Sequence, residues 1–95
     1  MVRSGKITSA RLNLAYMYRD GTDIEKDITE SYAWFLIFNE FKRDFSYIKQ
    51  QSIVKEIEQL EKELRADEKS NGQENAETIL GRPLLNMENL YKAEM

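Results

Sequence analysis

The side chains that most often do chemistry in proteins are missing from this sequence, with the exception of carboxylates. The chain carries 17 aspartates and glutamates but no histidine and no cysteine. Histidine is the usual general base and metal ligand, and cysteine supplies thiolates to nucleophiles, disulfides and zinc sites. No carboxylate adjoins a candidate nucleophile or lies in an apolar stretch that would raise its pKa. We therefore expect no catalytic residues and no enzymatic activity.

One short segment contains several carboxylates and could suggest a calcium-binding loop. The carboxylates are those of Asp20, Asp23, Glu25 and Asp27. In an EF-hand the ligands fall at alternate positions and a glycine is sixth in the loop, and this segment does not have that spacing. Residues 70–73, Ser-Asn-Gly-Gln, have the composition of a simple turn rather than of a phosphate-binding loop. We predict neither a metal site nor a cofactor site.

Length and composition indicate one small helical domain. The chain has 95 residues, of which 41% are hydrophobic and 33% are charged, as in globular rather than disordered proteins. It has one proline and four glycines, which are too few turn-forming residues for a fold of many β-strands. We expect a single all-α domain over residues 1–95.

The net charge of −3 is unevenly distributed along the chain. Residues 1–19 contain four basic residues and no acid, whereas residues 20–30 contain five acids and one lysine. Nucleic-acid binders usually have a basic excess, so the balance argues against nucleic acid. The acidic cluster either favours a basic protein as the partner or is an ordinary solvated surface, and a single charge cluster is more often the latter. The longest apolar run, residues 33–38, is too short to span a membrane, and the first residues lack the apolar segment of a signal peptide. We expect a cytoplasmic protein.

Hydrophobic spacing predicts a helical hairpin in the first half of the chain. Its first helix covers about residues 9–19 and ends before Gly21, because a glycine can adopt the left-handed conformation that terminates a helix. Its second helix begins at Asp27, which is spaced from Glu30 as in a capping box. The apolar run at residues 33–38 makes this second helix hydrophobic on nearly every side, so more than one neighbour must cover it.

The second half of the chain is expected to add a long helix and a short one. The long helix covers about residues 45–65, and one face of it carries a regular apolar seam, formed by Ile53, Ile57, Leu60 and Leu64. The segment 70–73 should break the chain, with Ser70 and Gln73 forming a second capping box for a helix that ends at Gly81. A last turn is expected in residues 84–91, and its packing side is Leu85, Leu90 and Tyr91.

The predicted hairpin has a specific residue pattern. It consists of Ala10, Asn13, Leu14, Ala15, Met17, Tyr18, Gly21, Ile24 and Asp27, followed by Ser31, Tyr32, Ala33, Trp34 and Phe35. In order and spacing this pattern resembles a Sel-one-like repeat over residues 5–41. That family consists of tetratricopeptide-related solenoids of paired helices. The resemblance implies that the alanines allow close helix approach, that Ile24 returns the loop to the core and that Tyr32 and Phe35 pack onto the first helix.

The chain departs from the family where the next repeat would stack. The family usually has small residues after the aromatic pair, whereas this chain has Phe38, Asn39 and Lys42. The resemblance therefore implies a single repeat whose next neighbour is the long helix. A lone repeat does not form a solenoid, so we expect residues 42–81 to serve as capping helices, followed by a C-terminal segment at 82–95.

A partner-binding surface is predicted at positions that the repeat pattern leaves free. By resemblance, the first helix lines the concave side of the superhelix, where Leu12, Tyr16 and Arg19 form one stripe. Apolar, aromatic and arginine side chains together are typical of interface hot spots. The neighbouring acids Asp20, Asp23 and Glu25 would extend this surface. The alternative is that the second half of the chain covers Leu12 and Tyr16.

These features predict a non-catalytic module that binds one dedicated protein partner. The most specific form of this hypothesis, which rests on analogy, is a bacterial immunity or inhibitor protein that neutralises a cognate toxin with a basic domain. One alternative is an adaptor or scaffold fragment of a regulatory complex. A second is a small nucleic-acid-binding regulator that uses the basic residues 1–19, and strong salt dependence of binding would distinguish it.

Overall fold

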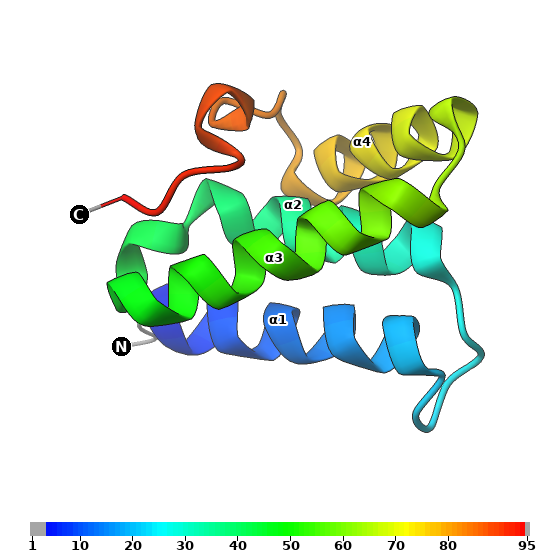
Figure 1. Ribbon diagram of the computed structural model, residues 1–95, viewed down its shortest axis with the longest axis horizontal. Helices are drawn as coiled ribbons and strands as arrows, with labels where there is room; N and C mark the ends of the chain where they lie inside the picture. The colour runs from blue at the N-terminus through cyan, green and yellow to red at the C-terminus, as the bar shows by residue number, and fades with distance from the viewer. Residues whose placement is uncertain (1–3, 95) are drawn as a thin grey trace.

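The fold is all-α, as the sequence predicts. The computed structural model describes residues 4–94, with side chains from Ala10 onward, and contains four α-helices and no strand in this range. The helices are α1 (Ser4–Asp20), α2 (Ile28–Glu40), α3 (Tyr47–Glu63) and α4 (Ala66–Leu80), and short 3-10 helices lie at Lys42–Asp44 and Met87–Asn89. Figure 1 shows α2 at the centre of the molecule, with α1, α3 and α4 arranged around it.

Helix α2 forms the middle of the core because it is hydrophobic on nearly every side. Phe35, Leu36 and Ile37 are fully buried, and Phe38 packs against the ring of Phe45 at a centroid distance of 4.9 Å. Covering α2 on several sides removes this apolar surface from water, which is the main stabilising contribution to such a small domain. Trp34 is only partly buried, in contrast to its neighbours. The expectation that more than one neighbour covers this helix is confirmed.

The α1–α2 connection has the predicted turn and the predicted cap residue, Asp27. The reciprocal bond of the predicted capping box is not formed, because the Asp27 N–H donates to the carbonyl of Tyr18. Gly21 has φ +72 and its N–H donates to the carbonyl of Met17 at 2.8 Å, which closes the end of α1. The Asp27 carboxylate accepts from the backbone N–H groups of Thr29 and Glu30 at 3.1 and 3.2 Å and caps α2. The side chain of Glu30 accepts a hydrogen bond from Asn75 of α4 and thereby joins α2 to α4.

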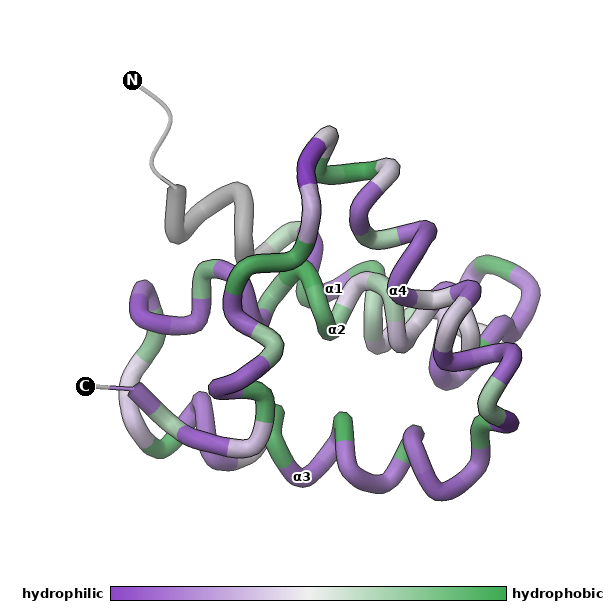
Figure 2. The backbone as a smooth tube through the Cα atoms, turned by 90° about the horizontal axis from the view of Figure 1, so that it is seen from above, coloured by the Kyte–Doolittle hydropathy of each residue, from purple (hydrophilic) through white to green (hydrophobic). Residues whose placement is uncertain are grey.

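Helix α3 packs with the seam that the sequence predicts. Ile53, Ile57 and Leu60 are fully buried, and Ser46 caps the start of the helix by accepting from the N–H of Lys49. Figure 2 shows the hydrophobic residues of α3 on the side that faces the rest of the molecule and hydrophilic residues on the outer side. The amphipathic pattern therefore orients this helix toward α2.

The predicted break at residues 70–73 is wrong, because α4 runs through this segment without interruption. The chain turns earlier, at Leu64 and Arg65, where the Glu68 carboxylate accepts from the backbone N–H of Arg65 at 2.9 Å. Gly72 lies inside α4 against the ring of Tyr32. A side chain at this position would collide with the ring, so the glycine permits a close helix approach rather than a turn.

The segment after α4, residues 82–94, is called the strap here. Helix α4 ends at Gly81 with φ +74, and the strap then passes over the C-terminal end of α2 and the N-terminal half of α3 (Figure 1). Leu90 is buried in the core, whereas Leu85 and Tyr91 are exposed. The expected packing side of this segment is thus correct only for Leu90. Leu84 and Met87 pack against the core instead of Leu85 and Tyr91, and hydrogen bonds also hold the strap.

Candidate partner-binding surface

The predicted stripe on α1 is largely covered by other parts of the molecule. Leu12 is only 4% exposed and belongs to the hydrophobic core. The expectation that Leu12 lies on a free surface is therefore wrong. Tyr16 packs edge-on against Phe35 with ring centroids 5.5 Å apart, and burial is the main cause that raises the pKa of its hydroxyl. The physical reason is that α2 packs along α1 and supplies Phe35, while α3 places the Lys49 ammonium 5.9 Å from the centre of the Tyr16 ring.

Arg19 is engaged within the chain as well. Its guanidinium lies 4.7 Å from the centre of the Tyr16 ring and forms ion pairs with Asp20 and with Glu56 of α3. A cation over an aromatic face gains electrostatic attraction from the ring. These contacts join α1 to α3, and the structure therefore brings Tyr16 and Arg19 together as parts of a helix–helix contact.

The three predicted acidic residues lie in or beside the exposed loop between α1 and α2. Asp20, Asp23 and Glu25 are all exposed, and the hydrogen bond from Arg19 lowers the pKa of the Asp20 carboxyl. Asp23 has φ +65, a left-handed conformation that aspartate adopts more readily than most residues. The structure thus presents these carboxylates to solvent and separates them from the covered Leu12. In the part of the chain that the structure describes, no group of three or more acidic, histidine or cysteine residues could hold a metal ion.

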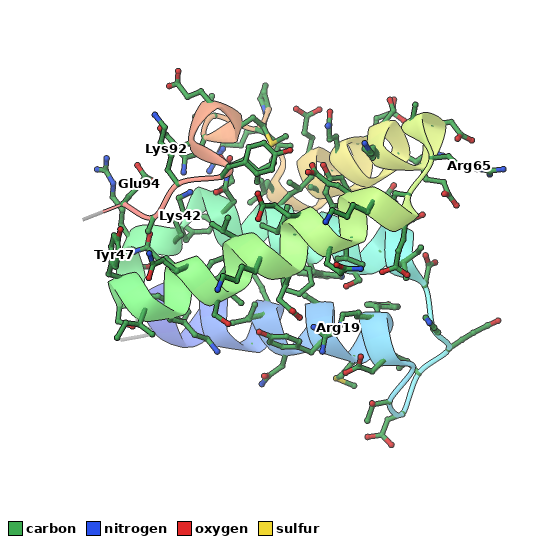
Figure 3. The ribbon with its side chains drawn as sticks, in the orientation of Figure 1. Arg19, Lys42, Tyr47, Arg65, Lys92 and Glu94 are labelled. Carbon is green, nitrogen blue, oxygen red and sulfur yellow. The ribbon has the colours of Figure 1, made fainter. Side chains whose placement is uncertain are left out.

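A more accessible surface lies between α3 and the strap. It is an open groove of about 490 Å³, called the α3 groove here. The residues that line it are Tyr47, Gln51, Val54, Lys55, Glu58, Tyr91, Lys92 and Ala93. Tyr47 and Tyr91 are 47% and 55% exposed, and Ile48, next to Tyr47, is 78% exposed. Figure 3 shows Tyr47 and Lys92 at the same end of the molecule. This groove contains two of the large apolar side chains that remain accessible, Tyr47 and Tyr91.

The ring of Tyr91 is held in place by a hydrogen bond to Glu61, which also binds Tyr32. Its hydroxyl donates to one oxygen of Glu61, and the hydroxyl of Tyr32 donates to the other oxygen at 2.8 Å. Burial and the Glu61 carboxylate raise the pKa of Tyr91 to about 12. For Tyr32 burial is the larger cause and Glu61 the second, and the pKa is raised further. Glu61 therefore fixes one wall of the α3 groove to the core.

Sequence reasoning did not find this groove because its two tyrosines are far apart in the chain. Tyr47 lies in the first turn of α3, and Tyr91 lies in the strap beyond the last helix. Hydrophobic periodicity assigns Tyr91 to a packing side, and no local pattern relates it to Tyr47. Only the return of the strap along α3 brings the two side chains to the same groove.

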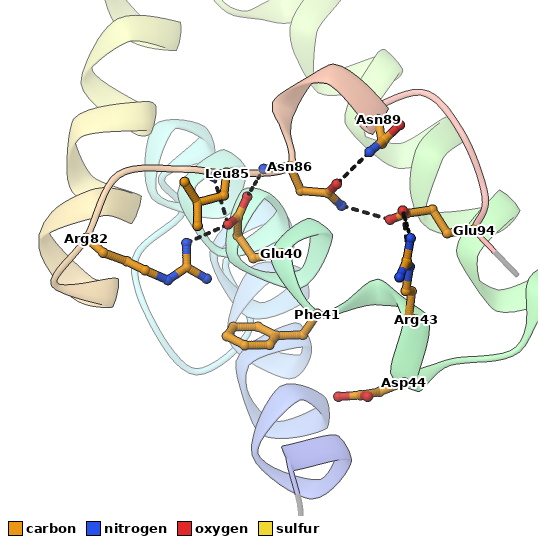
Figure 4. A pocket seen from close by; sticks show the side chains of 9 residues that line it. All are labelled: Glu40, Phe41, Arg43, Asp44, Arg82, Leu85, Asn86, Asn89 and Glu94. Atoms are coloured by element: carbon orange, nitrogen blue, oxygen red, sulfur yellow. Dashed lines mark hydrogen bonds and ion pairs between the residues drawn. The ribbon is translucent and has the colours of Figure 1, made fainter.

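A second groove lies between the strap and the end of α2, and its polar groups are bonded to one another (Figure 4). It has a volume of about 640 Å³. The Glu40 carboxylate accepts from Arg82 at 2.7 Å, and Arg43 forms an ion pair with Glu94 at 3.1 Å. A hydrogen bond from Asn86, followed by one from Arg43, lowers the pKa of the Glu94 carboxyl. These groups hold the strap, and we assign them a structural role.

No protein-family model, curated protein or solved structure matches this chain. The Sel-one-like resemblance therefore stays a prediction from the residue pattern. Within the described residues, no helix is long and apolar enough to cross a lipid bilayer.

Proposed function

We propose that this chain is a non-catalytic protein-binding domain and that the α3 groove is its binding surface. The observation that carries the proposal is the presence of two exposed tyrosines, Tyr47 and Tyr91, in one groove of a small helical domain. Soluble domains rarely leave several large apolar side chains exposed together unless a partner covers them. Tyrosine is also strongly enriched among the residues that dominate binding energy.

The chemistry of the groove fits a protein better than a small molecule. The groove is open rather than enclosed, and Lys55, Glu58 and Lys92 place charges of both signs along the two tyrosines. An apolar centre with a charged rim is the usual anatomy of a protein interface. A tyrosine loses little conformational entropy on binding because it has two side-chain torsions, and Glu61 already restricts Tyr91. The arrangement therefore favours a rigid aromatic contact.

The exposed acidic loop supports a partner with a basic surface. Asp20, Asp23 and Glu25 carry negative charge at the far end of the α1–α2 hairpin, and such charge steers the encounter with a positively charged protein. The specific form of the proposal, an immunity or inhibitor protein for a toxin with a basic domain, takes its support from this charge and from analogy.

The proposal also includes a single Sel-one-like repeat at α1–α2, which is supported by its residue pattern. It includes a cytoplasmic location as well, which is supported by the absence of cysteine.

Affinity capture from the native source tests this proposal. The tagged chain should retain a specific protein, and Tyr47→Ala should reduce the amount retained at least several-fold. Ile79→Ala serves as the matched control, because Ile79 is an exposed apolar residue of α4 that does not line the groove. Equal retention of the same protein by both variants would remove the α3 groove from consideration. A turnover activity that depends on one carboxylate, with the fold intact, would contradict the non-catalytic assignment.

A further inference from the structure

One lysine holds the backbone of the strap on both sides of Tyr91. The Lys42 ammonium donates to the carbonyl of Asn89 and to the carbonyl of Lys92. Between these two carbonyls, Leu90 enters the hydrophobic core and Tyr91 turns outward to line the α3 groove. Lys42 therefore fixes the backbone on either side of the tyrosine that forms the strap wall of the groove.

The Lys42 side chain is buried, although it carries a charge. It belongs to the short 3-10 helix that follows α2 and is only 2% exposed. Burial is the main cause that lowers the pKa of its amine, and the neighbouring Glu94 carboxylate acts in the opposite direction. A buried ammonium without hydrogen-bond partners is costly. The two strap carbonyls supply these partners, so a shift of the strap that breaks both bonds is strongly disfavoured.

The two ends of the strap have anchors of their own. At its start, the Glu40 carboxylate accepts from the backbone N–H groups of Leu85 and Asn86 at 3.0 and 2.9 Å. At its end, the Gln50 amide donates to the Glu94 carbonyl at 2.8 Å and accepts from the Glu94 N–H at 2.6 Å. Loss of the lysine contacts should therefore free the segment around position 91 without releasing the whole strap.

We propose that Lys42 is a positioning residue of the α3 groove, because its ammonium holds the backbone from which the Tyr91 ring extends. The hydrogen bond from the Tyr91 hydroxyl to Glu61 fixes only the tip of the ring. The two bonds to the flanking carbonyls fix its base. A side chain that is already held in its binding position loses less conformational entropy when a partner arrives. The effect of Lys42 on affinity rests on the proposed function of the groove, whereas its effect on Tyr91 does not.

The first experiment observes the Tyr91 ring in the chain alone at neutral pH. Tyrosine isotopically labelled at Cζ gives a separate NMR signal for each ring, and Tyr91→Phe assigns the signal of Tyr91. In Lys42→Met this signal should move toward its value in the unfolded chain, because the ring loses its bond to Glu61. The signal of Tyr32, which is bonded to the same carboxylate, should change far less. An unchanged Tyr91 signal in folded Lys42→Met would overturn the inference.

Two matched variants test whether the effect belongs to Lys42. Lys62→Met removes an exposed lysine of α3 that does not line the groove, and it should leave the Tyr91 signal in place. Gln50→Met removes the anchor of Glu94 and should also leave the Tyr91 signal in place, because Lys42 still holds the carbonyls on either side. A signal that moves as far in Gln50→Met as in Lys42→Met would contradict a specific role for the lysine.

Amide hydrogen exchange distinguishes positioning from a general contribution to stability. In Lys42→Met the amides of Leu90 and Lys92 should exchange about tenfold faster than in the wild type, while the buried amides of α2 change much less. If this variant does not fold, Lys42→Gln is measured instead, and its smaller acceleration should be confined to the same amides. Equal acceleration at every protected amide, or none, would overturn the inference.

These measurements use the chain without a partner, so their failure is distinct from failure of the proposed function. The α3 groove could bind its partner even if Lys42→Met left Tyr91 unchanged. Conversely, wild-type affinity in Tyr47→Ala and Tyr91→Ala would refute the binding function and leave the role of Lys42 intact.

Discussion

Gly72 of α4 lies directly against the ring of Tyr32 of α2. A side-chain atom built on Gly72 would be 2.7 Å from Cδ2 of that ring, closer than packed atoms approach. Tyr32 is fully buried, and its hydroxyl is bonded to Glu61. The ring therefore has little freedom to move aside, and the absence of a side chain at position 72 determines how closely α4 approaches α2.

This contact predicts that Gly72→Ala destabilises the protein. Alanine favours a helix by about 1 kcal/mol relative to glycine, whereas forcing an extra methyl group into a packed core costs about 1–3 kcal/mol. The expected net result is a loss of about 1–2 kcal/mol in the free energy of unfolding. Urea denaturation followed by circular dichroism measures it. Ser70→Ala, at an exposed position of the same helix, is the control, and a Gly72→Ala midpoint at or above wild type would contradict the packing.

The contrast between Gly72 and Gly21 shows what the sequence can and cannot predict. Gly21 follows a regular amphipathic segment and precedes a capping aspartate, so its turn is encoded by near neighbours. Gly72 lies in Ser-Asn-Gly-Gln, which has the local composition of a turn, but Tyr32 from another helix decides its role. Local signals therefore predicted the α1–α2 turn correctly and misplaced the start of α4.

Long-range contacts also explain why the predicted partner-binding stripe on α1 is covered in the structure. The stripe on α1 has the spacing of an exposed interface, and its burial depends on how α2 and α3 pack against α1. Lys42 and Gln50 are separated from the strap by most of α3 and all of α4, so no local pattern pairs them with residues near position 90. The fold class and the α3 seam were predictable because they depend on periodicity alone.

Tyr16→Ala should lower stability rather than remove a partner contact. Tyr16 packs against Phe35 and supports Arg19, so truncation should cost about 2 kcal/mol in the free energy of unfolding. Thermal melts and binding to the captured partner should be measured on the same variant. The folded fraction should bind with normal affinity. A large loss of affinity with an unchanged melting temperature would instead mean that Tyr16 contacts the partner.

The two raised tyrosine pKa values predict a loss of stability at alkaline pH. The pKa of Tyr91 rises from 10.0 in the unfolded chain to about 12 in the folded one, and that of Tyr32 rises further. Above pH 10 the unfolded state therefore binds fewer protons, so the free energy of unfolding falls as pH rises. The lowered pKa of Lys42 acts in the opposite direction. Denaturant titrations between pH 9 and about pH 12 should show the fall, and Tyr91→Phe should reduce it. A free energy of unfolding that does not change over this pH range would contradict the hydrogen bonds from Tyr32 and Tyr91 to Glu61.

The acidic loop makes a kinetic prediction. Replacing Asp23 and Glu25 by Asn and Gln removes two exposed charges without changing side-chain shape. Association with a basic partner should slow at low salt, while dissociation should change little, because such charges act mainly on the encounter. Surface plasmon resonance at several salt concentrations measures both rates. Unchanged association at low salt would exclude steering by this loop.

The central claim is that the α3 groove binds a protein partner, and calorimetric titration of that partner tests it most directly. Tyr47→Ala removes an exposed ring that makes no core contact in the hydrophobic cluster. It should weaken binding by about 2 kcal/mol, while the melting temperature stays close to that of the wild type. Tyr91→Phe keeps its ring and should bind more tightly than Tyr91→Ala. Wild-type affinity in both Tyr47→Ala and Tyr91→Ala would contradict the account.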